Sequence, residues 1–364
     1  LWRTEIMAEI ELKNIAHSYN PQAADMAYAL DPFDMTWVDG GRYAILGPSG
    51  CGKTTMLNIM SGIVQPSEGK LLFDGVDVTT LSTSERNIAQ VFQFPVIYGT
   101  MTVEQNLAFP LVCRNYEKSV IDAKVLEVAE ALSLQGLLKK SASRLTADQK
   151  QLISLGRGLV RDDVAAVLMD EPLTVIDPDL KFRLRRQLKE INQKYRSTLI
   201  YVTHDQNEAM TFAENIIVMD AGKIVQVGSP AELFDRPKTT FVGYFIGAPA
   251  MNFFNCQAAE GNKLSIGSAE ILTGTDLSKV GSAPLKLGIR SEYIRIVETK
   301  GVNTFTAQVQ RVEDLGNYKL MTAVFDGYVI KVKVERDIMV PAEHVELRLP
   351  AENCCVYAAD VLVS

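Results

Sequence analysis

The segment Gly47–Thr55, GPSGCGKTT, has the residue types and spacing of a loop that binds phosphate groups. Glycines let backbone N–H groups approach phosphate oxygens closely, and a lysine followed by a hydroxyl residue completes the pattern. We expect Lys53 to pair with the β- and γ-phosphates of a nucleotide, and the Thr54 hydroxyl to bind Mg²⁺. The whole loop is predicted to bind the nucleotide: Gly47, Pro48, Ser49, Gly50, Cys51, Gly52, Lys53, Thr54 and Thr55.

Two carboxylates, Asp170 and Glu171, follow the apolar run VAAVLM. A carboxylate at the end of a buried strand beside the loop can hold Mg²⁺, and a second one can polarise the attacking water. By itself this pair could equally be a strand end that meets solvent. In company with the phosphate loop, we assign the metal to Asp170 and the water to Glu171.

His204 closes a second apolar run, TLIYVTHD, and is one of three histidines in the chain. A structural role is the ordinary interpretation of such a residue. Its place on the strand that follows Asp170 and Glu171 favours a contact with the γ-phosphate instead. Gln93, in VFQFP, could similarly be a plain surface amide.

The elements that position these residues are predicted to be α/β up to about residue 240. A strand over 42–47 precedes the loop and a helix with the sequence KTTMLNIMSGI follows it, which is the context that a phosphate loop requires and an ordinary glycine turn does not. The runs 164–171 and 198–205 are expected to be buried parallel strands with functional groups at their C-terminal ends. We also predict a helix over 119–134 and a hairpin over 216–228.

The character of the sequence changes after GAPAMNFF (247–254). Short alternating segments separated by Gly, Asn, Asp and Pro predict a small antiparallel β domain. We therefore expect a nucleotide-binding domain over 7–240 and a β domain over 245–364. Met7 is a more natural start than Leu1, and we treat residues 1–6 as an upstream extension.

Composition excludes several classes of protein. A chain of 364 residues favours two domains, and a net charge of −7 argues against broad binding to nucleic acid or anionic lipid. The five cysteines show neither metal-ligand spacing nor a disulfide framework, which favours reduced thiols in the cytoplasm. No apolar run approaches the roughly 20 residues needed to cross a bilayer, so we expect a soluble protein.

In this order the motifs resemble those of ATP-binding subunits of ABC transporters, in the carbohydrate and polyol importer branch typified by the maltose-importer ATPase. The resemblance covers essentially the whole chain. It adds Tyr19 as the aromatic residue that stacks on adenine, Gln93 as the Q-loop, Asp177 at the end of TVID as the D-loop and His204 as the switch histidine. GAPAMNFF and LGIRSEYIRI (287–296) are similar to parts of that branch's regulatory domain, which implies an α/β P-loop NTPase domain with a helical subdomain, followed by an OB-like all-β regulatory domain.

The resemblance implies an ATPase at the cytoplasmic face of the inner (plasma) membrane, dimerised around two ATP molecules and driving two membrane permease subunits. Catalysis would involve Glu171, His204, Gln93 and Lys53, with Mg²⁺ held by Thr54, Gln93 and Asp170. The segment after Gln93 would dock the permease, and a periplasmic or external solute-binding protein would act indirectly. We expect import of a sugar, polyol or glycerol-type solute.

One motif departs from the family. Where the partner's ATP would meet the signature LSGGQ, this chain has Leu145, Thr146, Ala147, Asp148 and Gln149. Thr146 keeps a hydroxyl group, but Ala147 restricts backbone approach and Asp148 could cap the helix that begins here and occupy its donors. At a distance of 4 Å, the negative charges of Asp148 and of a phosphate group would repel each other by about 1–4 kcal/mol. The alternative is that Asp148 points into solvent and the site works normally.

Because the phosphate loop, Glu171 and His204 are intact, only the partner's site would be weakened. We therefore expect a heterodimer with a second, different ATPase subunit. The alternative function is a regulatory or structural subunit that binds ATP and hydrolyses little of it. A nucleic-acid-binding ATPase is disfavoured, because the region 245–364 has 12 Lys and Arg against 14 Asp and Glu.

Overall fold

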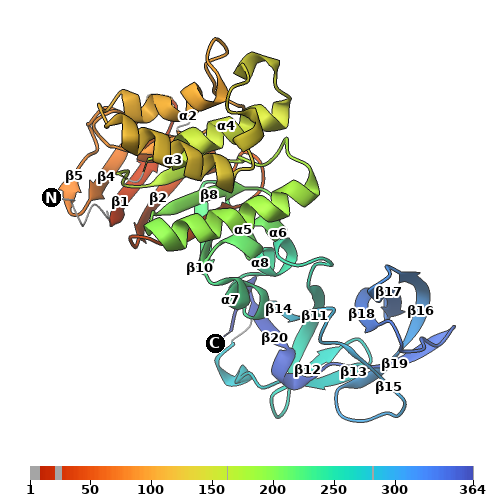
Figure 1. The fold of residues 1–364 in the computed structure, drawn as a ribbon. Helices are drawn as coiled ribbons and strands as arrows, with labels where there is room; N and C mark the ends of the chain where they lie inside the picture. Colours follow the sequence, from red (N-terminus) through yellow and green to blue (C-terminus); the bar gives the residue numbers. More distant parts are fainter. Residues whose placement is uncertain (1–8, 21–26, 162, 281–282, 364) are drawn as a thin grey trace. The chain divides into compact units, whose positions relative to one another are not determined.

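The computed structural model describes residues 9–20, 27–161, 163–280 and 283–363. The chain divides into two compact units, Leu1–Pro230 and Ala231–Ser364, called unit 1 and unit 2 here (Figure 1). Each unit has its own buried apolar core or cores.

Unit 1 is built around a six-stranded sheet of order β10-β9-β3-β8-β7-β6. Strands β6 to β9 run parallel to β3, and β10 pairs antiparallel with β9. Its members are β3 (Arg42–Leu46), β6 (Ala89–Val91), β7 (Val167–Asp170), β8 (Leu199–Thr203), β9 (Asn215–Asp220) and β10 (Lys223–Gly228). Every residue of β7 and β8 is buried, as their continuous apolar sequences predict.

A second sheet of unit 1 is antiparallel, of order β2-β1-β4-β5. Its strands are β1 (Ile10–His17), β2 (Leu30–Trp37), β4 (Glu68–Phe73) and β5 (Val76–Asp77). Apolar side chains of both sheets pack in one core that also takes up the buried face of α1 (Lys53–Ser61). The predicted strand, glycine loop and helix around the phosphate motif are confirmed.

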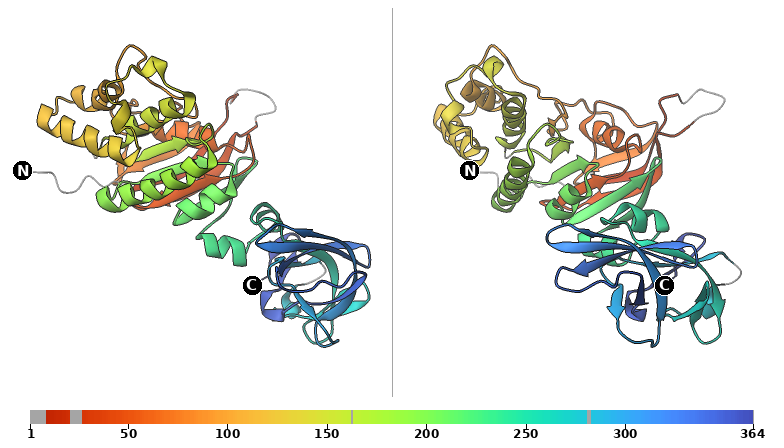
Figure 2. Two further views of the ribbon diagram at one scale, coloured as in Figure 1. Left: turned by 45° about the vertical axis from the view of Figure 1, so that its right-hand side comes forward. Right: turned by 90° about the vertical axis from the view of Figure 1, so that its right-hand side faces the viewer.

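Helices α2 (Val103–Val112), α3 (Lys118–Ala131) and α4 (Ala147–Leu159) gather at one end of unit 1 in all views (Figure 2). They form the helical subdomain that the family resemblance implies. The helices approach closely at Gly156, where a Cβ atom would lie 2.5 Å from the side chain of Leu107. The remaining helices of unit 1 are α5 (Pro178–Tyr195) and α6 (Gln206–Phe212), with 3-10 turns at Gln135–Leu137 and Ala142–Arg144.

Unit 2 is mostly β-structure, as predicted. One sheet contains β11 (Asn252–Ala259), β12 (Lys263–Ile266), β13 (Ala269–Leu272), β14 (Leu285–Ile289), β20 (Cys355–Ala358) and β21 (Val361–Leu362). The other contains β15 (Arg295–Val297), β16 (Thr304–Asp314), β17 (Tyr318–Phe325), β18 (Tyr328–Glu335) and β19 (His344–Arg348). All the strand pairs of both sheets are antiparallel, and 3-10 turns lie at Leu277–Lys279 and Ala351–Asn353.

The boundary between the units lies earlier than the predicted limits of 240 and 245. Helices α7 (Pro230–Asp235) and α8 (Thr240–Phe245) bond to the β-structure. The Tyr357 hydroxyl donates to the carbonyl of Pro237 at 3.0 Å, and the buried Arg290 guanidinium donates to the carbonyls of Phe234 and Gly243 at 2.9 Å. These long-range bonds assign the two helices to unit 2.

Candidate active site

The parallel strands of unit 1 bring the predicted residues together. Strands β3, β8, β7 and β6 are neighbours in the sheet, so their C-terminal ends meet at one edge. The phosphate loop follows β3, His204 follows β8, Glu171 follows β7 and Gln93 follows β6. Sequence order separates these residues, and sheet order makes them neighbours.

The phosphate loop is held tightly against the sheet. A Cβ atom at Gly47 would lie 2.3 Å from the carbonyl oxygen of Met219, so only glycine fits there. Gly50 and Gly52 adopt positive φ values of 81° and 103°, which glycine adopts without strain. Lys53 is 6% exposed and its Nζ donates to the carbonyl oxygens of Gly47 and Pro48 at 2.9 and 2.8 Å. The loop thus presents a fixed, nearly buried cation.

Thr54 and Asp170, two of the three residues predicted to hold Mg²⁺, contact each other. The Thr54 hydroxyl donates to Asp170 Oδ1 at 3.3 Å, and burial raises the pKa of the Asp170 carboxyl against the opposing effect of that hydrogen bond. The described residues include no group of three or more His, Cys, Asp or Glu side chains that could hold a metal alone. Phosphate oxygens and water would therefore complete the shell, as is usual for Mg²⁺. The hard oxygens of Thr54 and Asp170 fit that ion.

Glu171 is the meeting point of three elements. Its Oε1 lies 2.9 Å from His204 Nδ1, and its Oε2 accepts a hydrogen bond from Gln93 Nε2 at 3.2 Å. The Thr174 hydroxyl also approaches Oε2, at 3.4 Å. Glu171 has a positive φ of 44°, so the chain turns sharply at the end of β7. Glu171, the carboxylate predicted to act on the water, is thus contacted by both Gln93 and His204.

A cleft of about 570 Å³ contains most of the predicted set. Two lining residues, Ala29 and Thr174, were not predicted. For Thr174 the available signal was its position three residues after Glu171, in DEPLT. The cleft is lined by Tyr19, Ser49, Gly50, Gly52, Lys53, Thr54, Thr55, Gln93, Glu171 and His204, together with the two unpredicted residues.

Three predicted loop residues lie outside the lining of the cleft, and Tyr19, which is predicted to stack on adenine, is part of that lining. Gly47, Pro48 and Cys51 support the loop from behind rather than lining the cleft. Cys51 is 3% exposed, and burial raises the pKa of its thiol. Tyr19 is 60% exposed, and its hydroxyl lies 3.0 Å from the hydroxyl of Thr55, which leaves a ring available at the mouth of the cleft.

The signature residues lie at the start of α4, and none of them lines this cleft. Thr146 is the N-cap, and its N–H donates to Gln149 Oε1 at 3.3 Å in a capping box. The expectation that Asp148 caps this helix is therefore wrong, because Asp148 lies inside the first turn and a different residue holds the cap position. Asp148 still contributes a negative charge at this helix terminus.

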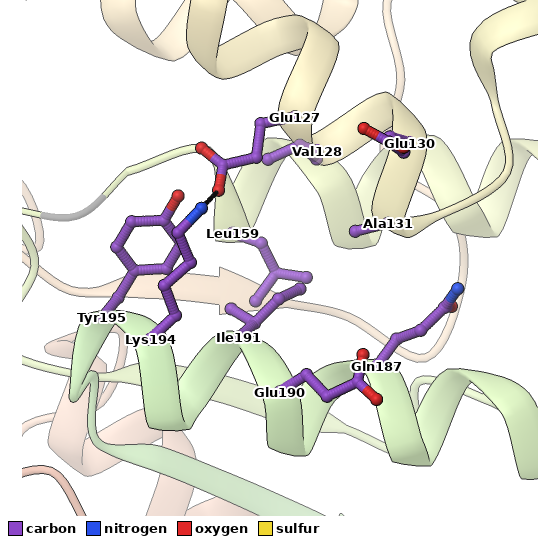
Figure 3. Close-up of a pocket in the computed structure, with 10 residues that line it drawn as sticks. All are labelled: Glu127, Val128, Glu130, Ala131, Leu159, Gln187, Glu190, Ile191, Lys194 and Tyr195. Atoms are coloured by element: carbon purple, nitrogen blue, oxygen red, sulfur yellow. Dashed lines mark hydrogen bonds and ion pairs between the residues drawn. The ribbon is translucent and has the colours of Figure 1, made fainter.

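A second cleft of about 380 Å³ lies between α3 and α5 and holds none of the predicted residues (Figure 3). Apolar side chains of Val128, Leu159 and Ile191 form its walls, and Lys194 pairs with Glu127 across it. Both partners of that ion pair are substantially exposed, so it adds little stability. The cleft at the sheet edge holds the phosphate loop, Glu171 and His204, so the chemistry is assigned there.

Within the described ranges, no helix combines the length and the apolar character that a bilayer span needs.

Known proteins resemble this chain over most of its length. The model of the ABC transporter family matches residues 30–174. The sn-glycerol-3-phosphate import ATP-binding protein UgpC 3 of Agrobacterium fabrum is 36% identical, over 90% of this chain and 91% of that protein. The oligosaccharides import ATP-binding protein MsmX of Bacillus subtilis is 35% identical, over 91% of this chain and 93% of that protein.

Solved structures agree with the fold of unit 1. The cbiO1 subunit of an ABC transporter complex of Clostridium perfringens superposes with a TM-score of 0.57 and 25% identity, covering 63% of this chain and 92% of that one. The ATP-binding cassette MJ0796, in a dimeric post-hydrolysis state bound to ADP and Pi, gives a TM-score of 0.55 at 27% identity, covering 61% and 98% of the two chains. The chain therefore belongs to the ABC transporter family, and it is an ATPase of that family.

Proposed function

We propose that this ATPase powers the import of a small sugar, polyol or glycerol-type solute. The observation that carries the proposal is the cleft in which the phosphate loop, Glu171 and His204 converge. Support for import comes from full-length relatives whose names specify glycerol-3-phosphate, trehalose or oligosaccharides. Those solutes differ among relatives that are about equally similar to this chain, so we propose a class of solute and not a single compound.

The residues of the cleft divide the work of phosphoryl transfer. Lys53 neutralises charge on the β- and γ-phosphates, and Tyr19 stacks on adenine at the mouth of the cleft. Thr54, Asp170 and Gln93 would hold Mg²⁺, which would supply further charge stabilisation. Glu171 orients the attacking water and accepts its proton, and His204 contacts the γ-phosphate side.

We propose that the ATPase dimer drives two membrane permease subunits at the cytoplasmic face of the plasma membrane, and that a permease docks on this chain at the segment after Gln93. The segment that follows β6 exposes large apolar side chains, with exposures of 72% at Phe94, 50% at Val96 and 40% at Tyr98. A groove of about 230 Å³ adjoins them and is lined partly by Pro110 and Arg157. An element of the permease that docks here would therefore touch the segment that contains Gln93, whose amide bonds to Glu171. A solute-binding protein outside the membrane would act through the permeases.

A second, different ATPase subunit is proposed as the dimer partner. The N-terminus of α4 would meet the partner's ATP, and helix N-termini attract anions. Here the capping box engages the Thr146 N–H, Ala147 stands where glycine would allow close approach, and Asp148 adds negative charge. Native mass spectrometry of the assembled transporter measures the composition: one copy of this chain with a second ATPase is expected, and two copies would contradict the heterodimer.

Glu171→Gln in the assembled transporter tests the hydrolytic role. We expect loss of most solute transport and ATP turnover with ATP binding retained, because the amide cannot accept the water's proton. Glu130→Gln, on the rim of the cleft between α3 and α5, is the matched control and should leave transport unchanged. Full transport by the Glu171→Gln protein would instead favour the regulatory or structural alternative.

A further inference from the structure

The buried carboxylate of Glu208 bonds to two residues of β8, the strand that His204 follows. Glu208 belongs to α6 and is 5% exposed. Its Oε2 accepts hydrogen bonds from the hydroxyl groups of Tyr201 at 2.8 Å and Thr203 at 2.9 Å, and its Oε1 accepts one from Lys181 Nζ at 3.1 Å. A carboxylate this deep is tolerated because donors compensate its lost hydration.

One of these donors connects Glu208 to the backbone on either side of His204. The Thr203 hydroxyl gives its proton to Glu208, and its oxygen accepts the N–H of Asp205 at 3.0 Å. The Asp205 carboxylate in turn caps α6, accepting the N–H groups of Asn207 at 2.7 Å and Glu208 at 3.4 Å. The residues before and after His204 are therefore both fixed.

The imidazole of His204 has few restraints of its own. Its side chain is 55% exposed, and the short polar contact that it makes is with Glu171 at 2.9 Å. The direction of the ring is consequently set by the backbone from which it projects. That backbone depends on the hydroxyl of Thr203, and the hydroxyl depends on Glu208.

We propose that Glu208 is a positioning residue for His204. By fixing the Thr203 hydroxyl, Glu208 fixes the backbone that carries the imidazole to Glu171. The ion pair with Lys181 holds this carboxylate against α5, so it cannot turn away from Thr203. The inference deepens the proposed site and rests on the role assigned there to His204.

The kinetic test uses Glu208→Gln in the transporter assembled from the full chain and its permeases. The amide has a single acceptor oxygen: with that oxygen toward the hydroxyl groups of Tyr201 and Thr203, its NH₂ group faces the Lys181 ammonium, and turned the other way it offers the hydroxyl groups no acceptor. We expect kcat to fall about tenfold to a hundredfold, the cost of a small misplacement of a catalytic group, with KM for ATP changed less than about twofold. Glu127→Gln breaks the exposed pair with Lys194 and is the matched control, with no expected change.

A double-mutant cycle separates positioning from general destabilisation. If Glu208 acts through His204, Glu208→Gln should have no further effect on kcat once His204 is replaced by alanine. A full additional loss in the His204→Ala protein would overturn the proposal. A normal kcat in the His204→Ala single variant would instead overturn the proposed role of His204. The NMR measurement of the His204 imidazole would then still show whether Glu208 positions that ring.

The spectroscopic test does not depend on activity. The chain has three histidines, His17, His204 and His344, so selectively labelled imidazole ¹⁵N signals are few and can be assigned by substitution. Glu208→Gln should move the Nδ1 signal of His204 toward its position in a Glu171→Ala protein, because the contact between His204 and Glu171 is weakened, and leave the other two unchanged. If Glu208→Gln folds poorly, Thr203→Val takes its place, and we expect the same movement of the His204 signal. Unmoved His204 signals in both variants would refute the inference.

Discussion

Asp148→Asn is expected to increase ATP hydrolysis in the assembled transporter. The substitution removes the charge at the start of α4 and keeps the size of the side chain. Because Thr146, not Asp148, holds the cap position, the helix keeps its capping box. The loss to the helix is confined to a favourable charge in the first turn, about 0.3–1 kcal/mol. The fold therefore tolerates the change.

The gain at the partner's ATP site is larger than that loss. Asp148 is in the first turn, which would face the γ-phosphate of ATP held by the partner. Two unit charges about 4 Å apart repel by about 1–4 kcal/mol, between the dielectric of water and that of a protein surface. Each 1.36 kcal/mol is a tenfold factor in rate, so the weakened site should speed up between about fivefold and about a thousandfold.

Single-turnover measurements distinguish the two sites. The wild-type transporter should hydrolyse about one ATP per dimer in the fast phase, and the Asp148→Asn transporter should approach two. Asp122→Asn, an exposed aspartate of α3, removes the same charge away from α4 and serves as the control. An unchanged fast phase in the Asp148→Asn protein, or a fall in its ATPase rate, would refute the electrostatic reasoning.

Two predictions concern stability. Arg86→Met should lower the free energy of unfolding by about 3 kcal/mol or more in urea titrations, because the buried guanidinium donates to the carbonyls of Leu81, Ile59, Met60 and Thr79, which would lose this donor. Arg186→Met, which breaks an exposed pair with Glu190, is its control and should change stability by less than about 1 kcal/mol, so equal losses would contradict the argument. For Asp170, burial raises the folded-state pKa, so its contribution to stability is fully present below the unfolded pKa and is lost as pH rises through the folded pKa. In unfolding curves recorded without nucleotide, the stability of the Asp170→Asn protein relative to wild type should therefore increase over that rise in pH. A difference in stability that does not change with pH would show that burial does not dominate the pKa of Asp170.

The sequence by itself determined the chemistry that is local in the chain. The phosphate loop lies within Gly47–Thr55, and the types and spacing of its glycines, its lysine and its hydroxyl residue suffice to predict their roles. The strands that end at Asp170 and Thr203 were also predictable, because fully buried parallel strands are continuous apolar runs. Local patterns suffice wherever one segment supplies both the structure and the chemistry.

Only the tertiary structure decided which distant groups meet. Gln93 and His204 converge on Glu171 because β6, β7 and β8 are neighbours in the sheet, an order that no local pattern encodes. Hydrogen bonds between distant segments likewise place α7 and α8 with unit 2 and join Lys181 to Glu208. The cap at Thr146, in contrast, depends on the residue at which the helix begins, and only Asp148 was predicted from the sequence as a possible cap. Hydrophobic periodicity specifies which faces are buried, but directional hydrogen bonds between elements form only after those faces have packed.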